Sequence, residues 1–452
     1  MLEKIMELLE GKKYQQLKAL LNSMEPVDIA ALLDEVPPEK LLLLFRILSK
    51  ENAADTFVEM DSVSQEVLIR SFKDAELEAV LDELFLDDTI DIIEEMPANV
   101  VKRILRHSDS ETRKKINELL NYPKDSAGSI MTIEYVDLKK TMTVSEAIDR
   151  IRKTGVDKET IYTCYVTETN RKLIGLVSVK TLLLSPNDAL LEDIMETNII
   201  FSHTHDDKED VANKINKYGF LAIPIVDNEG RLVGIVTVDD AIDVIQDETT
   251  EDIEKMAAIV PSDKPYLKTS TLDLFKKRIP WLLLLMISAT FTGKIITGFE
   301  NALQACVALT AFIPMLMDTG GNAGGQSSVT IIRGLSINEI EMGDILRILW
   351  KELRVAVICG LTLAAANFCK MMLVDRSSIA QSGSNVVLVC AVVSITLFVA
   401  VIIAKLVGCT LPIAAKRIGF DPAVMASPFI TTIVDACALL AYFNIAKIVL
   451  KI

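Results

Sequence analysis

Five apolar stretches in the second half of the chain constrain its fold more than any other feature. They lie at about residues 280–299, 305–331, 355–374, 386–410 and 423–448. Each is long enough to cross a hydrocarbon core of roughly 30 Å as a helix. The sequence therefore predicts a transmembrane domain of five helices over residues 276–452, with the lipid bilayer as its surroundings.

Charge separates this apolar part from the part that precedes it. Residues 1–274 contain 54 Asp and Glu against 32 Lys and Arg, whereas residues 275–452 contain 9 against 15. An acidic balance argues against nucleic acid as a partner, because phosphates are bound by Lys and Arg. It suits a protein that meets cations.

Basic residues beside the spans predict the orientation in the membrane. They precede the first span at Lys276, Lys277 and Arg278, and they lie between the second and third spans at Arg333, Arg347, Lys351 and Arg354. Residues 1–11 have the pattern of an amphipathic helix rather than of a signal peptide. We expect a multi-pass protein of the cell (inner) membrane, with a cytoplasmic N-terminus and an extracellular or periplasmic C-terminus.

The first domain, residues 1–125, is predicted to be all-α. Its apolar residues recur at helical spacing, and prolines at Pro26, Pro37, Pro38 and Pro97 separate the runs. Short helices in succession favour a small solenoid of helix pairs.

Residues 126–245 contain an internal repeat. Ile130-Met131 recurs as Ile194-Met195, 64 residues later, and the apolar strand around Gly175 recurs around Gly234. Each copy has the order β-α-β-β-α, and two such α+β units in tandem resemble a pair of CBS domains, here at 126–190 and 191–245. An acidic amphipathic helix with a linker, residues 246–275, then connects them to the membrane domain.

Asp435 lies inside the last apolar stretch, where a carboxylate is costly unless it faces water, a partner or an ion. One interpretation is packing against a neighbouring helix, and the other is an ion path. Pro428 is expected to open this helix and free carbonyl groups for an ion. Asp421, at the start of the stretch, either caps the helix or binds an ion.

A glycine-rich segment, residues 317–328, falls within the second apolar stretch. It includes Gly321 and Asn322, whose small size and amide oxygen suit either tight helix packing or contact with a hydrated ion. Lys294 and Lys405 are expected to extend their ammonium groups to the membrane surface.

Acidic residues outside the spans form a third set of candidates. They are either a solvated surface or ligands for a hard divalent cation, which prefers oxygen. The set comprises Asp87, Asp88, Asp91, Glu95, Asp207, Glu209, Asp240, Asp243, Asp247, Glu248, Glu251 and Asp252. The chain has no catalytic triad, redox motif or metal-hydrolase spacing, so we expect it not to be an enzyme.

The order of these parts resembles the MgtE family of bacterial magnesium transporters or channels over essentially the whole chain. The residues that carry the resemblance are the phrase from Phe312 to Gly324, the phrase from Asp421 to Asp435, and Thr250-Glu251-Asp252-Ile253 on the connecting, or plug, helix. The resemblance implies a homodimer whose ion path lies near the two-fold axis, with Asp435 and Asn322 beside a hydrated Mg²⁺. It also implies that cytosolic Mg²⁺ bridges the acidic domains and closes the path.

Three departures from the family's pattern affect the sites. Gly325 replaces an Asn of the glycine-rich motif, and Gly219 stands where some members have an acidic residue. Only the second CBS unit has the acidic ribose-binding pattern, at Thr237 and Asp239, so ATP is a second candidate ligand there.

Two other functions stay open. A membrane-anchored metal or nucleotide sensor without transport would need neither Asp435 nor the glycine-rich segment. Secondary transport would need more buried titratable groups than the spans contain. Selectivity among Mg²⁺, Mn²⁺, Co²⁺ and Ni²⁺ stays open too.

Overall fold

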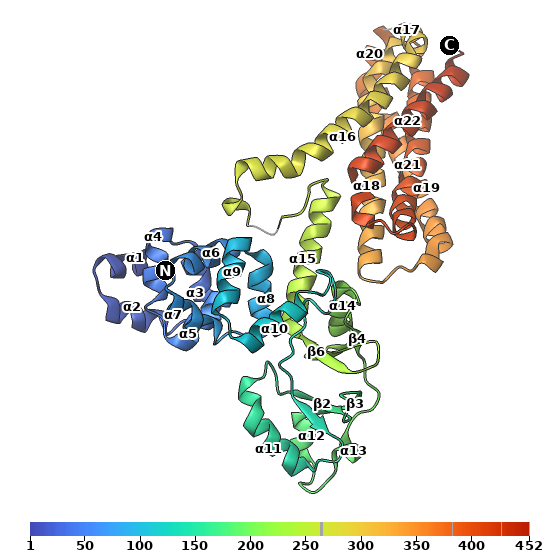
Figure 1. The fold of residues 1–452 in the computed structure, drawn as a ribbon. Coiled ribbons are helices and arrows are strands. Elements are labelled where there is room, and N and C mark those ends of the chain that lie inside the picture. Colours follow the sequence, from blue (N-terminus) through green and yellow to red (C-terminus); the bar gives the residue numbers. More distant parts are fainter. Residues whose placement is uncertain (263–264, 382, 426, 452) are drawn as a thin grey trace. The chain divides into compact units, whose positions relative to one another are not determined.

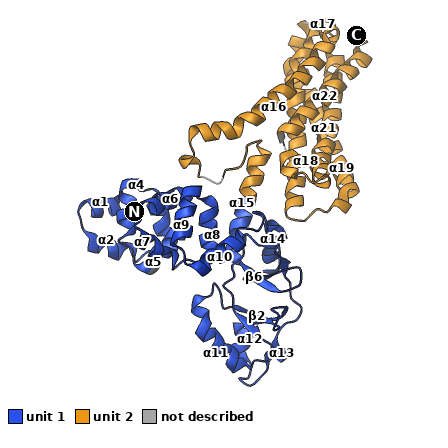
Figure 2. Ribbon diagram, viewed as in Figure 1, with its two compact units in different colours: residues 1–247 blue, residues 248–452 orange. Residues whose placement is uncertain are grey.

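The computed structural model describes residues 1–262, 265–381, 383–425 and 427–451. The chain divides into two compact units, unit 1 (Met1–Asp247) and unit 2 (Glu248–Ile452), which are shown in Figure 2. Each unit has its own hydrophobic core.

Unit 1 begins with ten short helices, as the proline-separated runs predict (Figure 1). They are α1 (Leu2–Glu10), α2 (Tyr14–Leu21), α3 (Pro26–Asp34), α4 (Pro38–Phe45), α5 (Lys50–Val58), α6 (Ser62–Ser71), α7 (Asp74–Leu81), α8 (Leu86–Glu95), α9 (Ala98–His107) and α10 (Ser110–Leu119). Local signals set their starts: Pro26 and Pro38 occupy first-turn positions, and Asp61 and Asp109 accept hydrogen bonds from first-turn amides. Alternate helices pack together, α3 on α5 and α5 on α7, which gives a helical solenoid.

Two three-stranded sheets follow, with the same topology. The first unit contains β1 (Asp137–Lys139), α11 (Val144–Thr154), the turn η1 (Gly155–Asp157), β2 (Thr163–Thr167), β3 (Leu173–Ser178) and α12 (Val179–Leu184). The second contains α13 (Leu191–Ile194), β4 (Ser202–His203), α14 (Lys208–Tyr218), β5 (Ala222–Val226), β6 (Leu232–Thr237) and α15 (Val238–Met256). In each sheet the first strand is parallel to the second, and the second is antiparallel to the third.

The repeated residues of the sequence explain how the two sheets pack. A side chain at Gly175 would collide with Met195, and one at Gly234 would collide with Met131. Each glycine therefore makes room for the methionine that begins the other repeat.

Unit 2 is helical. Its elements after α15 are η2 (Tyr266–Lys268), α16 (Thr271–Gly298), α17 (Glu300–Ala305), η3 (Val307–Phe312), α18 (Ile313–Ser336), η4 (Met342–Asp344), α19 (Ile345–Lys370), the π-helical turn η5 (Met371–Asp375), α20 (Arg376–Gln381), α21 (Val386–Arg417), η6 (Pro422–Met425) and α22 (Ser427–Leu450). Helix α21 is central and packs against α18, α19 and α22.

Four helical segments in the described residues are long and apolar enough to cross a membrane: Thr271–Gly298, Met342–Gln381, Val386–Arg417 and Pro422–Leu450. Helix α18 has 24 residues but is less apolar, because it carries the glycine-rich segment. The predicted number of five spans is therefore not confirmed.

Candidate functional site

Six carboxylates gather in unit 1 and form what we call the acidic cluster. Two come from the first turn of α8, one each from the segments before β1 and β2, and two from the first turn of α15. They are Asp87, Asp88, Glu134, Glu159, Asp239 and Asp240, and their charges act on one another. The chain thus brings like charges together from four segments.

Asp87 is the most buried of the six. Its residue is 8% exposed, and its buried Oδ1 has no hydrogen-bond partner among the described residues. Burial, and then the charge of Asp240, raise the pKa of Asp87 well above its usual value. An orphaned buried carboxylate oxygen is costly, and a bound cation would satisfy it.

The neighbouring carboxyl groups are perturbed in the same direction. Burial, followed by the charge of Asp240, raises the pKa of Asp88 to about 7, and burial followed by Asp88 raises that of Glu159 to about 7. Burial raises the pKa of Asp240 to about 6, although Thr237 donates its hydroxyl to Asp240 Oδ2 at 2.5 Å. Oxygen donors of this kind fit Mg²⁺ or Ca²⁺.

Within the residues described, however, no three His, Cys, Asp or Glu side chains are already arranged to hold a metal ion. The cluster supplies suitable donors, and an ion would have to draw them closer. Asp91 lies one turn further along α8 and is also opposed by Asp240 and Asp88.

The other acidic residues of unit 1 that were predicted as metal ligands lie outside the acidic cluster. Asp207 caps α14, where its Oδ1 accepts from the Glu209 amide at 2.8 Å. Glu95 is the last residue of α8. Asp243 lies in the second turn of α15, where the charges of Asp247 and Asp239 act on it. The structure therefore brings together Asp87, Asp88, Asp91 and Asp240, but it does not unite the whole predicted set.

Three further acids with perturbed pKa values were not predicted from the sequence: Glu59, Glu134 and Glu159. Glu59 lies at the end of α5, where partial burial and then the charge of Asp243 raise its pKa. Glu134 and Glu159 are single acids in loop segments of the first CBS unit. None belongs to an acidic run, so local sequence carried no signal for them.

In unit 2, Lys255 near the end of α15 forms ion pairs with nearby carboxylates. Lys255 Nζ lies 2.6 Å from Asp421 Oδ2 and also pairs with Glu251. Burial and the charge of Asp421 raise the pKa of neighbouring Asp252. Asp421 also accepts from the Ala423 amide at 2.8 Å, so it caps η6 as well as pairing with Lys255. Glu248 begins this unit, at the boundary next to Asp247.

The glycine-rich segment of α18 packs closely on α22. A Cβ at Gly321 would lie 2.9 Å from Thr431 Cγ2, and one at Gly320 would lie 3.0 Å from Val434 Cγ1. Asp435 follows Val434 and is partly exposed. Asn322 is exposed on the surface of the single chain.

Two predictions for the membrane domain are wrong. Pro428 does not open the last helix, because it lies in the first turn of α22, where no helical hydrogen bond is lost. Lys405 does not extend to the membrane surface: it is 5% exposed and lies 3.8 Å from Glu352 Oε2. Lys294, by contrast, is exposed in the single chain, and its extension to the membrane surface stays a prediction.

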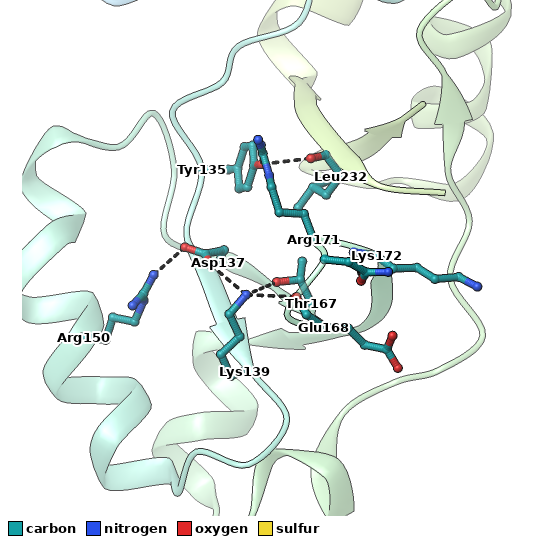
Figure 3. Close-up of polar contacts among 10 residues, drawn as sticks. Tyr135, Asp137, Lys139, Arg150, Thr167, Glu168, Arg171, Lys172 and Leu232 are labelled. Atoms are coloured by element: carbon teal, nitrogen blue, oxygen red, sulfur yellow. Dashed lines mark hydrogen bonds and ion pairs between the residues drawn. The ribbon is translucent and has the colours of Figure 1, made fainter. Parts of the chain in front are cut away.

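The CBS pair also contains a cavity of about 240 Å³, and Figure 3 shows the polar contacts of several side chains beside it. Its lining residues are Ile133, Tyr135, Asp137, Lys158, Thr167 and Arg171. Arg171 donates to Tyr135 Oη at 2.9 Å, and Asp137 is held by Arg150 at 2.5 Å. The predicted nucleotide residues Thr237 and Asp239 do not line this cavity.

Known family models match most of the chain. Residues 313–445 match the family model described as a divalent cation transporter, residues 24–125 match the MgtE intracellular N domain, and residues 127–186 and 191–247 match CBS domains. These matches confirm the predicted fold class of a helical N-terminal domain, a CBS pair and a helical C-terminal part.

Relatives that match nearly the whole chain, and solved structures of the soluble part, support the same family. The chain is 34% identical over 451 residues to the magnesium transporter MgtE of Thermus thermophilus, covering 99% of this chain and 98% of the relative. It is 32% identical over 447 residues to that of Bacillus subtilis, covering 98% and 96%. The solved cytosolic domain of the Mg²⁺ channel MgtE in complex with ATP matches 54% of this chain and 100% of that one, at 33% identity and a TM-score of 0.52.

The solved soluble part of a magnesium transporter matches 55% of this chain and 97% of that one, at 30% identity and a TM-score of 0.51. Relatives named as transporters also confirm the expectation that the chain is not an enzyme. The chain belongs to the MgtE family of divalent cation transporters.

Proposed function

We propose that this protein transports Mg²⁺ across the cell membrane and that Asp435 lines the ion path. The observation that carries the proposal is the packing of α18 on α22, which places the glycine-rich segment beside the residues that precede Asp435. A carboxylate within an apolar helix is expected to face an ion or water. Relatives over nearly the whole chain are named magnesium transporters.

The ion path is formed by two copies of the chain. A single copy leaves Asn322 exposed and Asp435 partly exposed, so both side chains are free to face a partner across a two-fold axis. Two carboxylates at one level would hold a largely hydrated Mg²⁺, because this ion gives up its water reluctantly. Asp421 and Gly321 flank the same path.

Mg²⁺ on the cytoplasmic side closes the path. The acidic cluster supports this step, because its carboxyl groups have raised pKa values and Asp87 keeps an orphaned oxygen. An ion that binds between α8 and the first turn of α15 would oppose their repulsion. It would favour the conformation in which these segments are close, and thereby shift the population toward the closed state.

Transport is tested by Mg²⁺ flux into liposomes that contain the full chain. We expect Asp435→Asn to abolish most of the flux, because it removes the charge but keeps the shape. Glu300→Gln is the matched control, since this exposed acid lies at the start of α17, outside the predicted path. Unchanged flux in Asp435→Asn would remove this residue from the path, and no flux in folded wild type would favour a sensor without transport.

ATP is a second ligand that we propose for the CBS pair. The support is the related cytosolic domain solved in complex with ATP. Titration calorimetry of the full chain with ATP, compared between wild type and Asp239→Asn, tests whether the predicted residues take part. Equal affinities would exclude Asp239.

A further inference from the structure

Lys405 and Glu352 form a buried ion pair that the transport proposal does not use. Their side chains are 7% and 15% exposed, and the Nζ and Oε2 atoms are 3.8 Å apart. The two residues come from α21 and α19, so the pair connects two helices of unit 2.

A serine on a third helix bridges the two charges. Ser327, on α18, donates its hydroxyl to Glu352 Oε2 at 2.7 Å and accepts from Lys405 Nζ at 3.2 Å. Ser327 is 2% exposed. The three side chains therefore join α18, α19 and α21 at one buried point.

This point lies one turn from the tightest contact of the glycine-rich segment. A Cβ at Gly324, three residues before Ser327, would lie 3.1 Å from the carbonyl oxygen of Ala404, the residue before Lys405. The same Cβ would lie 2.8 Å from Ile430 Cγ2 and 3.5 Å from Val434 Cγ2, on α22. A shift of α18 at Ser327 would therefore be passed directly to the segment of α22 that carries Asp435.

We propose that Lys405, Ser327 and Glu352 form a charge clamp that positions α18, and through it Asp435, for ion passage. The clamp rests on the proposed transport function. Two buried opposite charges with a bridging hydroxyl stabilise one arrangement of three helices, whereas a single remaining charge would draw in water and displace the helices. These residues are positioning residues, and they do not contact the transported ion.

The test is a double-mutant cycle with Lys405→Met, Glu352→Gln and the two together, in the full chain. We expect each single variant to lower maximal Mg²⁺ flux roughly tenfold and to raise the half-saturating Mg²⁺ concentration, because an unpaired buried charge displaces α18. The double variant, which leaves no charge unpaired, should recover flux to within about threefold of wild type. Lys405→Arg should retain most of the flux, and the control Lys294→Met, an exposed lysine on α16, should match wild type.

Several results would overturn the clamp. A double variant no better than the worse single variant would show that the pair is not coupled. Opposite changes of flux in the two single variants would show that the charges act on the passing ion instead. A fall in maximal flux at an unchanged half-saturating concentration would show only a loss of folded protein.

Thermal unfolding of the same four proteins in detergent separates this proposal from the transport proposal. Non-additive changes of melting temperature support the clamp even if wild type carries no Mg²⁺, in which case the transport proposal alone fails. Additive changes contradict the clamp whatever the flux.

Discussion

At the residue scale, the proposed closure by Mg²⁺ rests on the carboxyl groups of the acidic cluster. Asp87, Asp88 and Asp240 are held near one another by the solenoid and the CBS pair, although their charges repel. The carboxylates in this arrangement repel one another, and binding of a divalent cation or a proton reduces this repulsion.

Neutralising one of these carboxylates should stabilise the protein when no divalent cation is present. In Asp88→Asn the repulsion with Asp240 is removed, and we expect the melting temperature in EDTA to rise by a few degrees. The stabilisation by added Mg²⁺ should shrink in the same variant. Circular dichroism of the full chain in detergent measures both, with Asp28→Asn, an exposed acid on α3, as the control. A lower melting temperature in EDTA would show that Asp88 is not under repulsion.

The same groups predict how stability depends on pH. The pKa values of Asp88 and Glu159, both about 7, lie above the values near 4 that these groups have in an unfolded chain. The folded state therefore binds more protons than the unfolded state between about pH 4 and 7, so stability falls as pH rises through this window. Melting in EDTA at pH 5 and pH 8 should show a higher melting temperature at pH 5, and Mg²⁺ should reduce the difference. A higher melting temperature at pH 8 in EDTA would contradict these raised pKa values.

At the scale of elements, two helices carry most of the candidate residues: α15 in the acidic and Lys255 sites, and α18 in the membrane domain. The first turn of α15 contributes to the acidic cluster, and its last turn carries Lys255 within unit 2. Helix α18 joins its neighbours through glycines and through Ser327.

Lys255 occupies the place of a cation between Glu251 and Asp421. We expect Lys255→Met to leave these carboxylates unpaired, so that residues 248–256 exchange amide hydrogens faster at low Mg²⁺. High Mg²⁺ should restore part of the protection, because the ion can replace the ammonium group. Hydrogen exchange followed by mass spectrometry measures this, with Lys276→Met, an exposed lysine on α16, as the control. Unchanged exchange in Lys255→Met would contradict a role for the pair in holding the helix.

The glycine contacts of α18 predict a packing effect. A Cβ at Gly408 of α21 would collide with the carbonyl oxygen of Gly324, whereas no atom of the described residues lies within 4 Å of a Cβ at Gly293. Gly408→Ala should therefore lower the melting temperature and the flux. Gly293→Ala should be neutral or stabilising by about 0.5–1 kcal/mol, because Ala favours the helix. Equal effects of the two substitutions would contradict the close approach of α18 and α21.

At the scale of the whole molecule, the sequence predicted the parts whose signals are local. The CBS repeat could be predicted because its Met and Gly positions recur along the chain. In the structure these residues pack between the copies, Gly175 against Met195 and Gly234 against Met131. The sequence could not predict Glu159 or the burial of Lys405, because these depend on which segments meet in space. The apolar sequence around a lysine does not indicate whether its side chain faces lipid or a glutamate on another helix.

Closure of the ion path by Mg²⁺ at the acidic cluster can be measured directly. It is tested by measuring Mg²⁺ flux into liposomes at increasing Mg²⁺ on the cytoplasmic face, for wild type and for Asp88→Asn/Asp240→Asn. We predict that wild-type flux falls as this Mg²⁺ rises, whereas the flux of the double variant changes little with Mg²⁺, because the variant has lost both the repulsion and two of the carboxylates that would bind the ion. Suppression of both proteins at the same Mg²⁺ concentration would contradict closure by Mg²⁺ at this cluster.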